Sequence, residues 1–137
     1  MREILFRGKT EQGKWVQGYY LGVIQFPNSI AQNCIVEAKL DFDFVCKTNA
    51  QQVYTVIPET VGQYTGLTDK KGKKIFEGDI AIVGSIRYIV AFKGAEWKFS
   101  HISGQPYCYP FFASHAKDSE VIGNIHDNPE LWEVDNG

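Results

Sequence analysis

The chain has 137 residues, a formal net charge of −2, and 22% charged and 44% hydrophobic residues. This length and composition are typical of one globular domain, or of two very small ones, that folds without metal ions or disulfide bonds, and they exclude a disordered chain. The slightly negative charge excludes a protein that wraps nucleic acid by bulk electrostatics, because such proteins are strongly basic.

Alternation of apolar and polar residues with period two recurs along most of the chain and predicts strands rather than helices. In the longest such segment, residues 14–24, Trp15, Tyr19, Leu21 and Val23 share one parity. We expect bends or bulges at the glycines of this strand, Gly18 and Gly22, unless another group packs closely there. Seven further strands are predicted, at residues 4–7, 33–38, 52–57, 80–83, 86–93, 96–102 and 120–125.

The predicted connections between these strands are short and leave little room for helix. Gly84-Ser85 is a two-residue link, and residues 93–96 form the next turn, so residues 80–102 should form a meander. Single helical turns are predicted where Pro58 and Pro129 occupy early helical positions. The fold class we expect is therefore all-β, with an N-terminal β subdomain at residues 1–58 and a small SH3-like β-barrel at residues 59–137, or both within one domain.

The lysine-rich stretch Asp69-Lys70-Lys71-Gly72-Lys73-Lys74 raises the question of phosphate binding. A phosphate-binding loop needs a following helix whose N–H groups point at the anion, and no helix is predicted here. Asp at the first and Gly at the fourth position instead predict a hairpin turn with a left-handed Gly72. Gly78-Asp79 likewise predicts a sharp turn before the next strand. The lysines would then discourage edge-to-edge pairing of strands.

Three segments of the chain resemble one family. They are residues 63–80, which include the lysine turn and Glu77-Gly78-Asp79-Ile80, residues 120–131, which read Glu-Val-Ile-Gly-Asn-Ile-His-Asp-Asn-Pro-Glu-Leu, and residues 2–8. Together they are similar to the YopX family of phage and prophage proteins. The resemblance implies a β-rich fold, a mobile-element origin and cytoplasmic residence, and it brings no catalytic residue, cofactor or metal ligand. Residues 26–52 carry no part of it.

The cysteines Cys34, Cys46 and Cys108 are far apart and form no Cys-x-x-Cys pair, so they predict neither a disulfide framework nor a zinc site. This favours a reducing compartment. The N-terminus is too charged for a signal peptide, and no apolar run is long enough to span a membrane. We therefore expect a soluble, cytoplasmic protein.

Other candidate sites each have a simpler structural interpretation, which we favour. Asp41 and Asp43 suit a divalent cation but form too small a ligand set, so a solvated face explains them better. Cys108 with His101 or His115 would make a nucleophilic pair, although nothing orients the imidazole. His126 is expected to be a surface residue of the closing turn. A cluster of aromatic residues suits either base stacking or a barrel core, and we favour the core: Trp97, Phe99, Tyr107, Tyr109, Phe111 and Phe112.

These observations predict a non-enzymatic binding or assembly protein that self-associates into a homo-oligomer through strand edges or aromatic surface. The alternative is an accessory protein that binds nucleic acid through a lysine and aromatic surface, and an enzyme of unknown reaction is a distant third interpretation. We expect no cofactor, metal, membrane or small-molecule partner. The candidate nucleic-acid contacts are Lys70, Lys71, Lys73, Lys74, Arg87 and Lys98, and the turn residues assigned to structure are Asp69, Gly72, Gly78 and Asp79.

Overall fold

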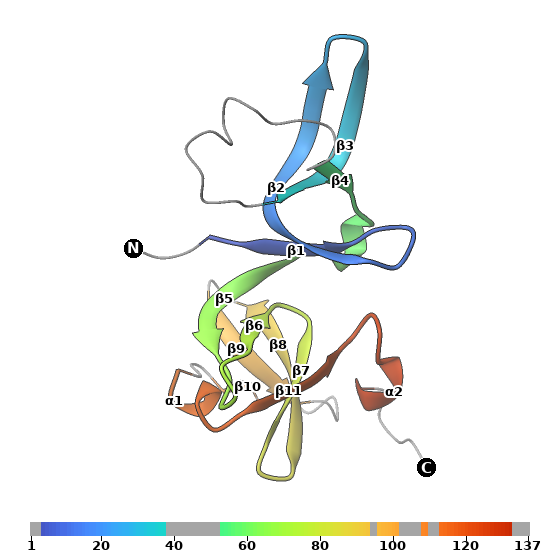
Figure 1. Ribbon diagram of the computed structural model, residues 1–137. Coiled ribbons are helices and arrows are strands. Elements are labelled where there is room, and N and C mark those ends of the chain that lie inside the picture. Colours follow the sequence, from blue (N-terminus) through green and yellow to red (C-terminus); the bar gives the residue numbers. More distant parts are fainter. Residues whose placement is uncertain (1–3, 38–52, 94–95, 102–107, 110–112, 133–137) are drawn as a thin grey trace. The chain divides into compact units, whose positions relative to one another are not determined.

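Antiparallel β-sheet makes up most of the regular structure in the computed structural model of the protein (Figure 1), which describes residues 4–37, 53–93, 96–101, 108–109 and 113–132. The predicted all-β class is therefore confirmed. The chain divides into two compact units, Met1–Gln63 and Tyr64–Gly137. The assignment of independent subdomains to residues 1–58 and 59–137, and of an SH3-like barrel to the second, stays a prediction.

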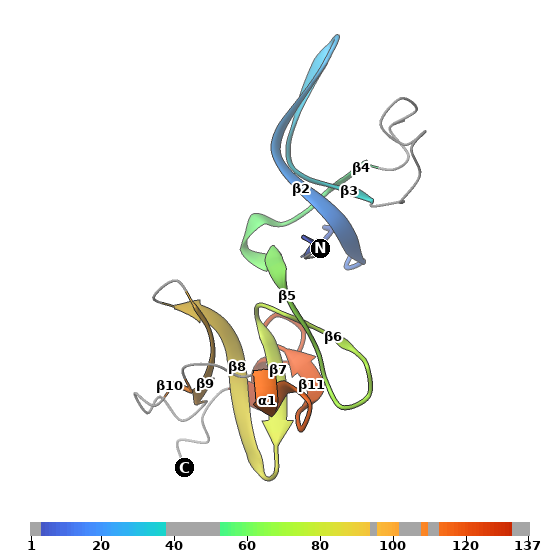
Figure 2. The ribbon, with the colours of Figure 1, turned by 90° about the vertical axis from the view of Figure 1, so that its left-hand side faces the viewer.

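The first unit is a sheet in the order β4-β3-β2-β1-β5. Its elements are β1 (Phe6–Lys9), β2 (Trp15–Phe26), β3 (Ser29–Glu37), β4 (Val53–Thr55), the 3-10 helix η3 (Pro58–Thr60) and the start of β5 (Gly62–Thr68). The long strand β2 pairs with β1 near its start and with β3 from Gly18 to its end. Figure 2 shows β2 and β3 as a long, curved ribbon.

Cys34 and Val36, which pair with Leu21 and Tyr19, are buried on one face of the sheet of the first unit, and the core cluster lies on the opposite face. Val16, Ile35 and Val56 are buried there, and partly buried aromatic residues such as Tyr20 pack against them. The hydroxyl of Tyr20 donates a hydrogen bond of 2.8 Å to Oδ1 of Asn33, which satisfies the polar end of a ring whose body is apolar.

Gly18 marks a close approach of two backbones rather than a bulge, because the pairing of β2 with β1 and β3 shows no register shift there. A Cβ at this position would overlap the carbonyl oxygen of Val36. At Gly22 the ladder also keeps its register, and the irregularity falls on Asn33 across the ribbon, which has a φ of 54°. The pairing therefore contains no bulge at either glycine, and the alternative expectation of a bend at these positions stays a prediction.

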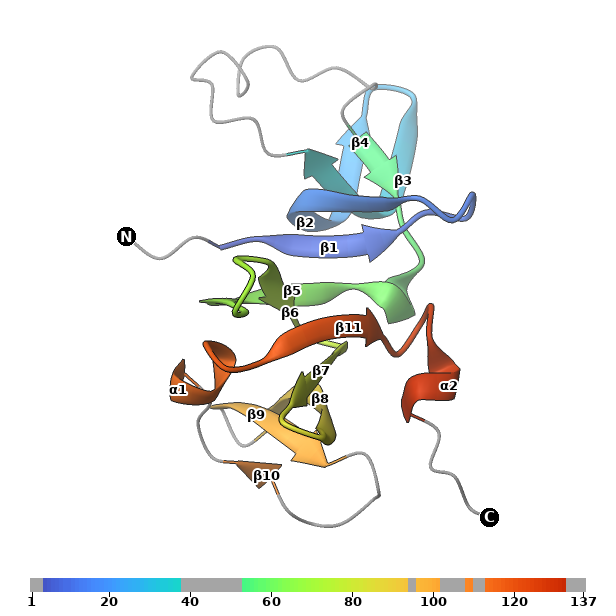
Figure 3. The same ribbon diagram turned by 60° about the horizontal axis from the view of Figure 1, so that its bottom comes forward.

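The second unit contains a sheet in the order β10-β9-β8-β7-β11, with β5 and β6 as a further hairpin. Figure 3 shows β11, which is the last strand in sequence, with α1 and α2 at its two ends. The bounds are β6 (Lys74–Phe76), β7 (Asp79–Val83), β8 (Ile86–Lys93), β9 (Glu96–His101), β10 (Cys108–Tyr109), α1 (Ala113–Ala116), β11 (Glu120–Asn124) and α2 (Pro129–Trp132).

The predicted meander is confirmed, since β7, β8 and β9 pair in sequence with Val83 opposite Ile86 and Lys93 opposite Glu96. The core of this unit contains Ile75, Ala81, Tyr88, Val90, Ala116 and Val121. The sequence analysis predicted the hairpin turn between β5 and β6 but not the bounds of these strands, and it did not predict β10 or α1. These elements are short or irregular: β6 and β10 have three and two residues, and the pairing of β5 with β6 shifts register between Tyr64 and Thr68.

Candidate functional site

The lysine-rich stretch is the turn of the hairpin between β5 and β6. The Gly72 amide donates to the Asp69 carbonyl at 3.0 Å, the Asp69 amide donates to the Lys73 carbonyl at 2.8 Å, and Gly72 has a φ of 82°. This is the left-handed glycine that the Asp-x-x-Gly spacing predicts. Strand β6 follows directly, so no helix N-terminus is available to hold a phosphate in the way a P-loop does.

Asp69 organises this turn through its carboxylate, which is almost fully buried with 5% of the residue exposed. Its Oδ1 accepts hydrogen bonds of 2.9 Å from the amides of Lys71 and Lys73, and its Oδ2 accepts one of 2.9 Å from the amide of Val121 on β11. Burial of the carboxylate opposes its ionisation, but these three amides, together with the charge of Lys73, outweigh burial and lower the pKa of Asp69. The carboxylate therefore serves the fold.

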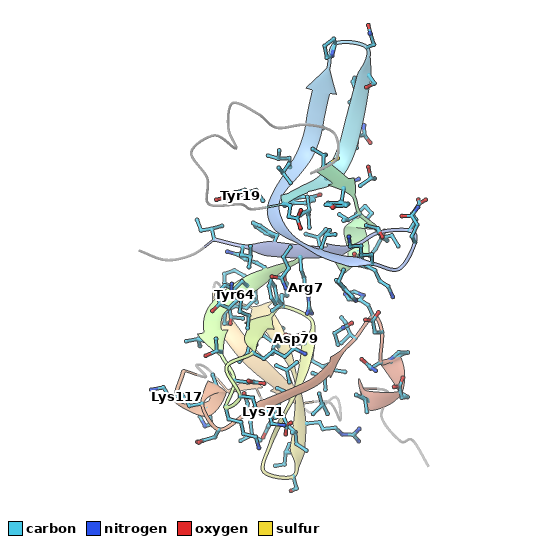
Figure 4. The ribbon with its side chains drawn as sticks, in the orientation of Figure 1. Arg7, Tyr19, Tyr64, Lys71, Asp79 and Lys117 are labelled. Carbon is cyan, nitrogen blue, oxygen red and sulfur yellow. The ribbon has the colours of Figure 1, made fainter. Side chains whose placement is uncertain are left out.

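Two of the candidate nucleic-acid lysines are engaged by an acid of the same unit. The Lys71 ammonium (Figure 4) donates a hydrogen bond of 2.6 Å to Oε1 of Glu120, and the Lys70 ammonium lies 3.6 Å from Oε2. This hydrogen bond and the charge of Glu120 raise the pKa of Lys71, and the same contact lowers the pKa of Glu120. The negative charge of Glu120 therefore neutralises part of the positive charge that would attract a phosphate group.

The other candidate contacts are spread over different elements. The Lys74 ammonium lies 5.3 Å from the ring centroid of Tyr64, which is a cation–π contact. Arg87 is exposed on β8, and the backbone of Lys98 on β9 pairs with Ala91. The side chain of Lys98 lies outside the described part. That these residues contact nucleic acid stays a prediction.

The second predicted turn contains Gly78, which lies between β6 and β7, and Asp79, which is the first residue of β7 and is labelled in Figure 4. Gly78 has a φ of 90°, and the buried Asp79 carboxylate accepts a hydrogen bond of 2.7 Å from the Phe76 amide. The Gly78 amide donates to the Val90 carbonyl at 2.9 Å, and the Gly78 carbonyl accepts from the Ile125 amide at 2.9 Å. The turn therefore connects β6 and β7 to β8 and to the residue that follows β11.

Many of the remaining candidate residues lie outside the described part of the chain. These are Asp41, Asp43, Cys46, Tyr107, Phe111 and Phe112, together with the side chains of Phe99, His101, Cys108 and Tyr109. Cys34 is completely buried. Trp97 packs against the core of the second unit and makes an edge contact with Phe92 at 5.0 Å between ring centroids, which fits the core interpretation of this ring. In the described part, no three His, Cys, Asp or Glu residues are grouped as metal ligands would be.

Sequence reasoning did not identify an exposed apolar face on the β2–β3 ribbon, formed by Tyr19, Leu21, Val23 and Ile30. These residues are 45%, 43%, 64% and 63% exposed. Ile30 pairs with Gln25, so it lies on the same face as the odd-numbered residues of β2. We call these four residues the ribbon face. The shared parity of the three β2 residues was visible in the sequence, but alternation does not tell which face of a strand is exposed.

Comparison with known proteins identifies the family. A family model described as YopX protein matches residues 5–133, nearly the whole chain. The chain belongs to the YopX family. Among solved structures, this YopX family member is similar to protein EF1440 from Enterococcus faecalis, with a TM-score of 0.56 and 22% sequence identity over 97% of this chain and 100% of that one. That likeness concerns the fold alone.

No curated protein matches the chain. None of the helices in the described part has the length and apolar composition that crossing a membrane requires.

Proposed function

We propose that this YopX family member is a phage- or prophage-derived protein that acts by binding and assembly rather than by catalysis, and that it self-associates. The observation that carries the proposal is the ribbon face, where Val23 and Ile30 each leave more than 60% of their surface in water. Contiguous exposed apolar patches of this kind mark interaction surfaces in soluble proteins. A cytoplasmic location and an SH3-like form of the second unit belong to the same proposal, and family membership and the small antiparallel sheet support them.

The test is the mass in solution, measured by light scattering across a tenfold dilution in about 0.15 M salt. If the protein self-associates, its mean mass in solution should rise above the 15.5 kDa of one chain as its concentration increases. A mass near 15.5 kDa at every concentration would contradict self-association.

Binding of single-stranded nucleic acid is a second candidate, favoured by a different observation. The Arg7 guanidinium lies 4.9 Å and the Lys9 ammonium 6.0 Å from the ring centroid of Trp15, so cations and an aromatic ring share one surface of the first unit. Single-strand binding proteins combine such groups. The lysine turn argues less strongly for this function, because Glu120 engages two of its lysines.

The measurement for this candidate is the affinity for a labelled single-stranded oligonucleotide at several salt concentrations. Affinity should fall as salt rises if phosphates are contacted. A variant with Arg7→Gln and Lys9→Gln should bind more weakly, whereas Lys117→Gln, at an exposed position after α1, is the matched control. Absence of binding at low salt would contradict the candidate.

A further inference from the structure

The outer half of the β2–β3 ribbon has no neighbouring strand among the described residues. β1 pairs with residues 15–18 of β2, and β4 pairs with residues 34–36 of β3. Residues 23–26 and 29–32 pair with each other, with Val23 opposite Gln32 and Phe26 opposite Ser29. Figure 1 shows this part of the ribbon extending past β1 and β4 within the first unit.

A two-stranded ribbon of this kind is marginally stable in water and needs further strands, or packing of an apolar face, to be well ordered. Its outer edges also carry unpaired backbone groups, which natural proteins protect with charged residues, bulges or proline. The hairpin of the second unit follows that pattern, since it carries four lysines around Gly72.

The β2–β3 ribbon lacks such charges. Residues 15–36 contain no Asp, Glu, Lys, Arg or His, although at the 22% average of the chain a stretch of this length would hold about five charged residues. An uncharged apolar face gives phosphates nothing to bind, and it gives a strongly charged protein no complementary group. It does complement a second copy of itself, because two such faces meet without repulsion between like charges.

The size of the ribbon face indicates how tight such an association would be. With the exposed fractions given above, its four side chains present roughly 400 Å² of apolar surface, within the range of patches that are functional on monomers. A stable interface of standard size buries about 800 Å² on each partner. The ribbon face therefore supplies about half of that area, which is appropriate for reversible, concentration-dependent pairing.

We propose that two copies of the chain pack ribbon face to ribbon face around a two-fold axis, so that each ribbon provides the apolar cover that the other lacks. This inference rests on the proposed self-association and specifies its surface. Tyr19, whose side chain is shown in Figure 4, lies where the ribbon joins the sheet of the first unit, and Val23 and Ile30 lie on the outer half.

The experiment compares solution masses of the full chain and of single variants across a dilution series. Val23→Lys and Ile30→Lys place an ammonium on the ribbon face and should weaken association at least tenfold, because the paired copies would bury like charges. Ile86→Lys is the matched control, since Ile86 is a 41% exposed strand residue in the second unit. It should associate as the wild type does. Unchanged melting temperatures would show that the variants remain folded.

A mixing experiment tests the same interface by a gain of association rather than by a loss. Val23→Lys and Val23→Glu should each be monomeric, and an equimolar mixture at low salt should form a heterodimer, because opposite charges then meet across the interface. If Val23→Lys and Ile30→Lys both associated as strongly as the wild type, the ribbon interface would be overturned, whereas the proposal of self-association would stand. A wild type that is monomeric at all concentrations would overturn both proposals.

Discussion

Removal of the Asp69 carboxylate should destabilise the second unit more than removal of any exposed acid. Asp69→Ala deletes three acceptor contacts, of which the bond to the Val121 amide is buried, while those to Lys71 and Lys73 lie at the exposed turn. A buried donor that loses a charged acceptor costs about 2 kcal/mol, and each exposed amide, which water can solvate again, costs about 0.5 kcal/mol. The sum is about 3 kcal/mol of unfolding free energy.

Asp69→Asn separates these contributions. The amide oxygen can still accept from Lys71 and Lys73, but the NH₂ group then faces the Val121 amide and both are donors. This variant should lose about 2 kcal/mol. Urea denaturation at neutral pH measures both values, and Asp118→Asn, at an exposed acid beyond α1, is the control that should change little.

The contribution of Asp69 should also depend on pH. Its pKa in the folded protein is lowered, so the carboxylate binds protons more weakly in the folded than in the unfolded state. The stabilisation is therefore complete above the unfolded pKa of about 4 and decreases as the pH falls through the folded pKa. Asp69→Asn should show a weaker loss of stability on acidification than the wild type. If Asp69→Asn and Asp118→Asn unfolded at the same urea concentration, the role assigned to Asp69 would be refuted.

Three further changes test the local geometry. Gly72→Ala should cost about 1 kcal/mol in urea denaturation, because φ is 82° and no atom lies near enough to clash; no loss would contradict the left-handed turn. Gly18→Ala should cost about 3 kcal/mol, since its Cβ would overlap the Val36 carbonyl, and a wild-type midpoint would contradict that close approach. Deletion of residues 127–137 removes α2 and the Asn128 acceptor of the Asn124 amide, so the melting temperature should fall by several degrees, and an unchanged value would show this segment to be dispensable.

The parts of the fold that the sequence predicted are those specified by neighbouring residues. The turn at Asp69 and Gly72 depends on a spacing of three residues, and the helical turns at Pro58 and Pro129 depend on the fixed φ of proline. The same holds for the β7–β8 link, where two residues separate strongly alternating segments. Such features need no knowledge of the rest of the chain.

The parts that were missed depend on residues far apart in the sequence. Asp69 and Val121 are separated by 52 positions, and no local pattern shows that the carboxylate of one accepts from the amide of the other. The pairing of Lys71 with Glu120 is equally non-local. Strand β5 contains Gly66 at a φ of 88°, which interrupts the alternation that identifies strands. For the ribbon face, the pattern was visible, but its exposure depends on which neighbours β2 acquires.

The residues that identify the family are not the residues that we propose as the interaction surface. Asp69, Gly72, Gly78 and Asp79 belong to the recognised motifs, and all four have intramolecular roles: two buried carboxylates accept backbone amides, and two glycines supply left-handed turns. Their contacts explain how the second unit holds its shape and leave little for a partner to bind. The ribbon face has the opposite character, since it is uncharged and exposed and lies on strands that exceed their neighbours in length. Val23 and Ile30 are the most exposed large apolar side chains in the described part of the chain, and for that reason we propose that the interaction surface lies in the first unit.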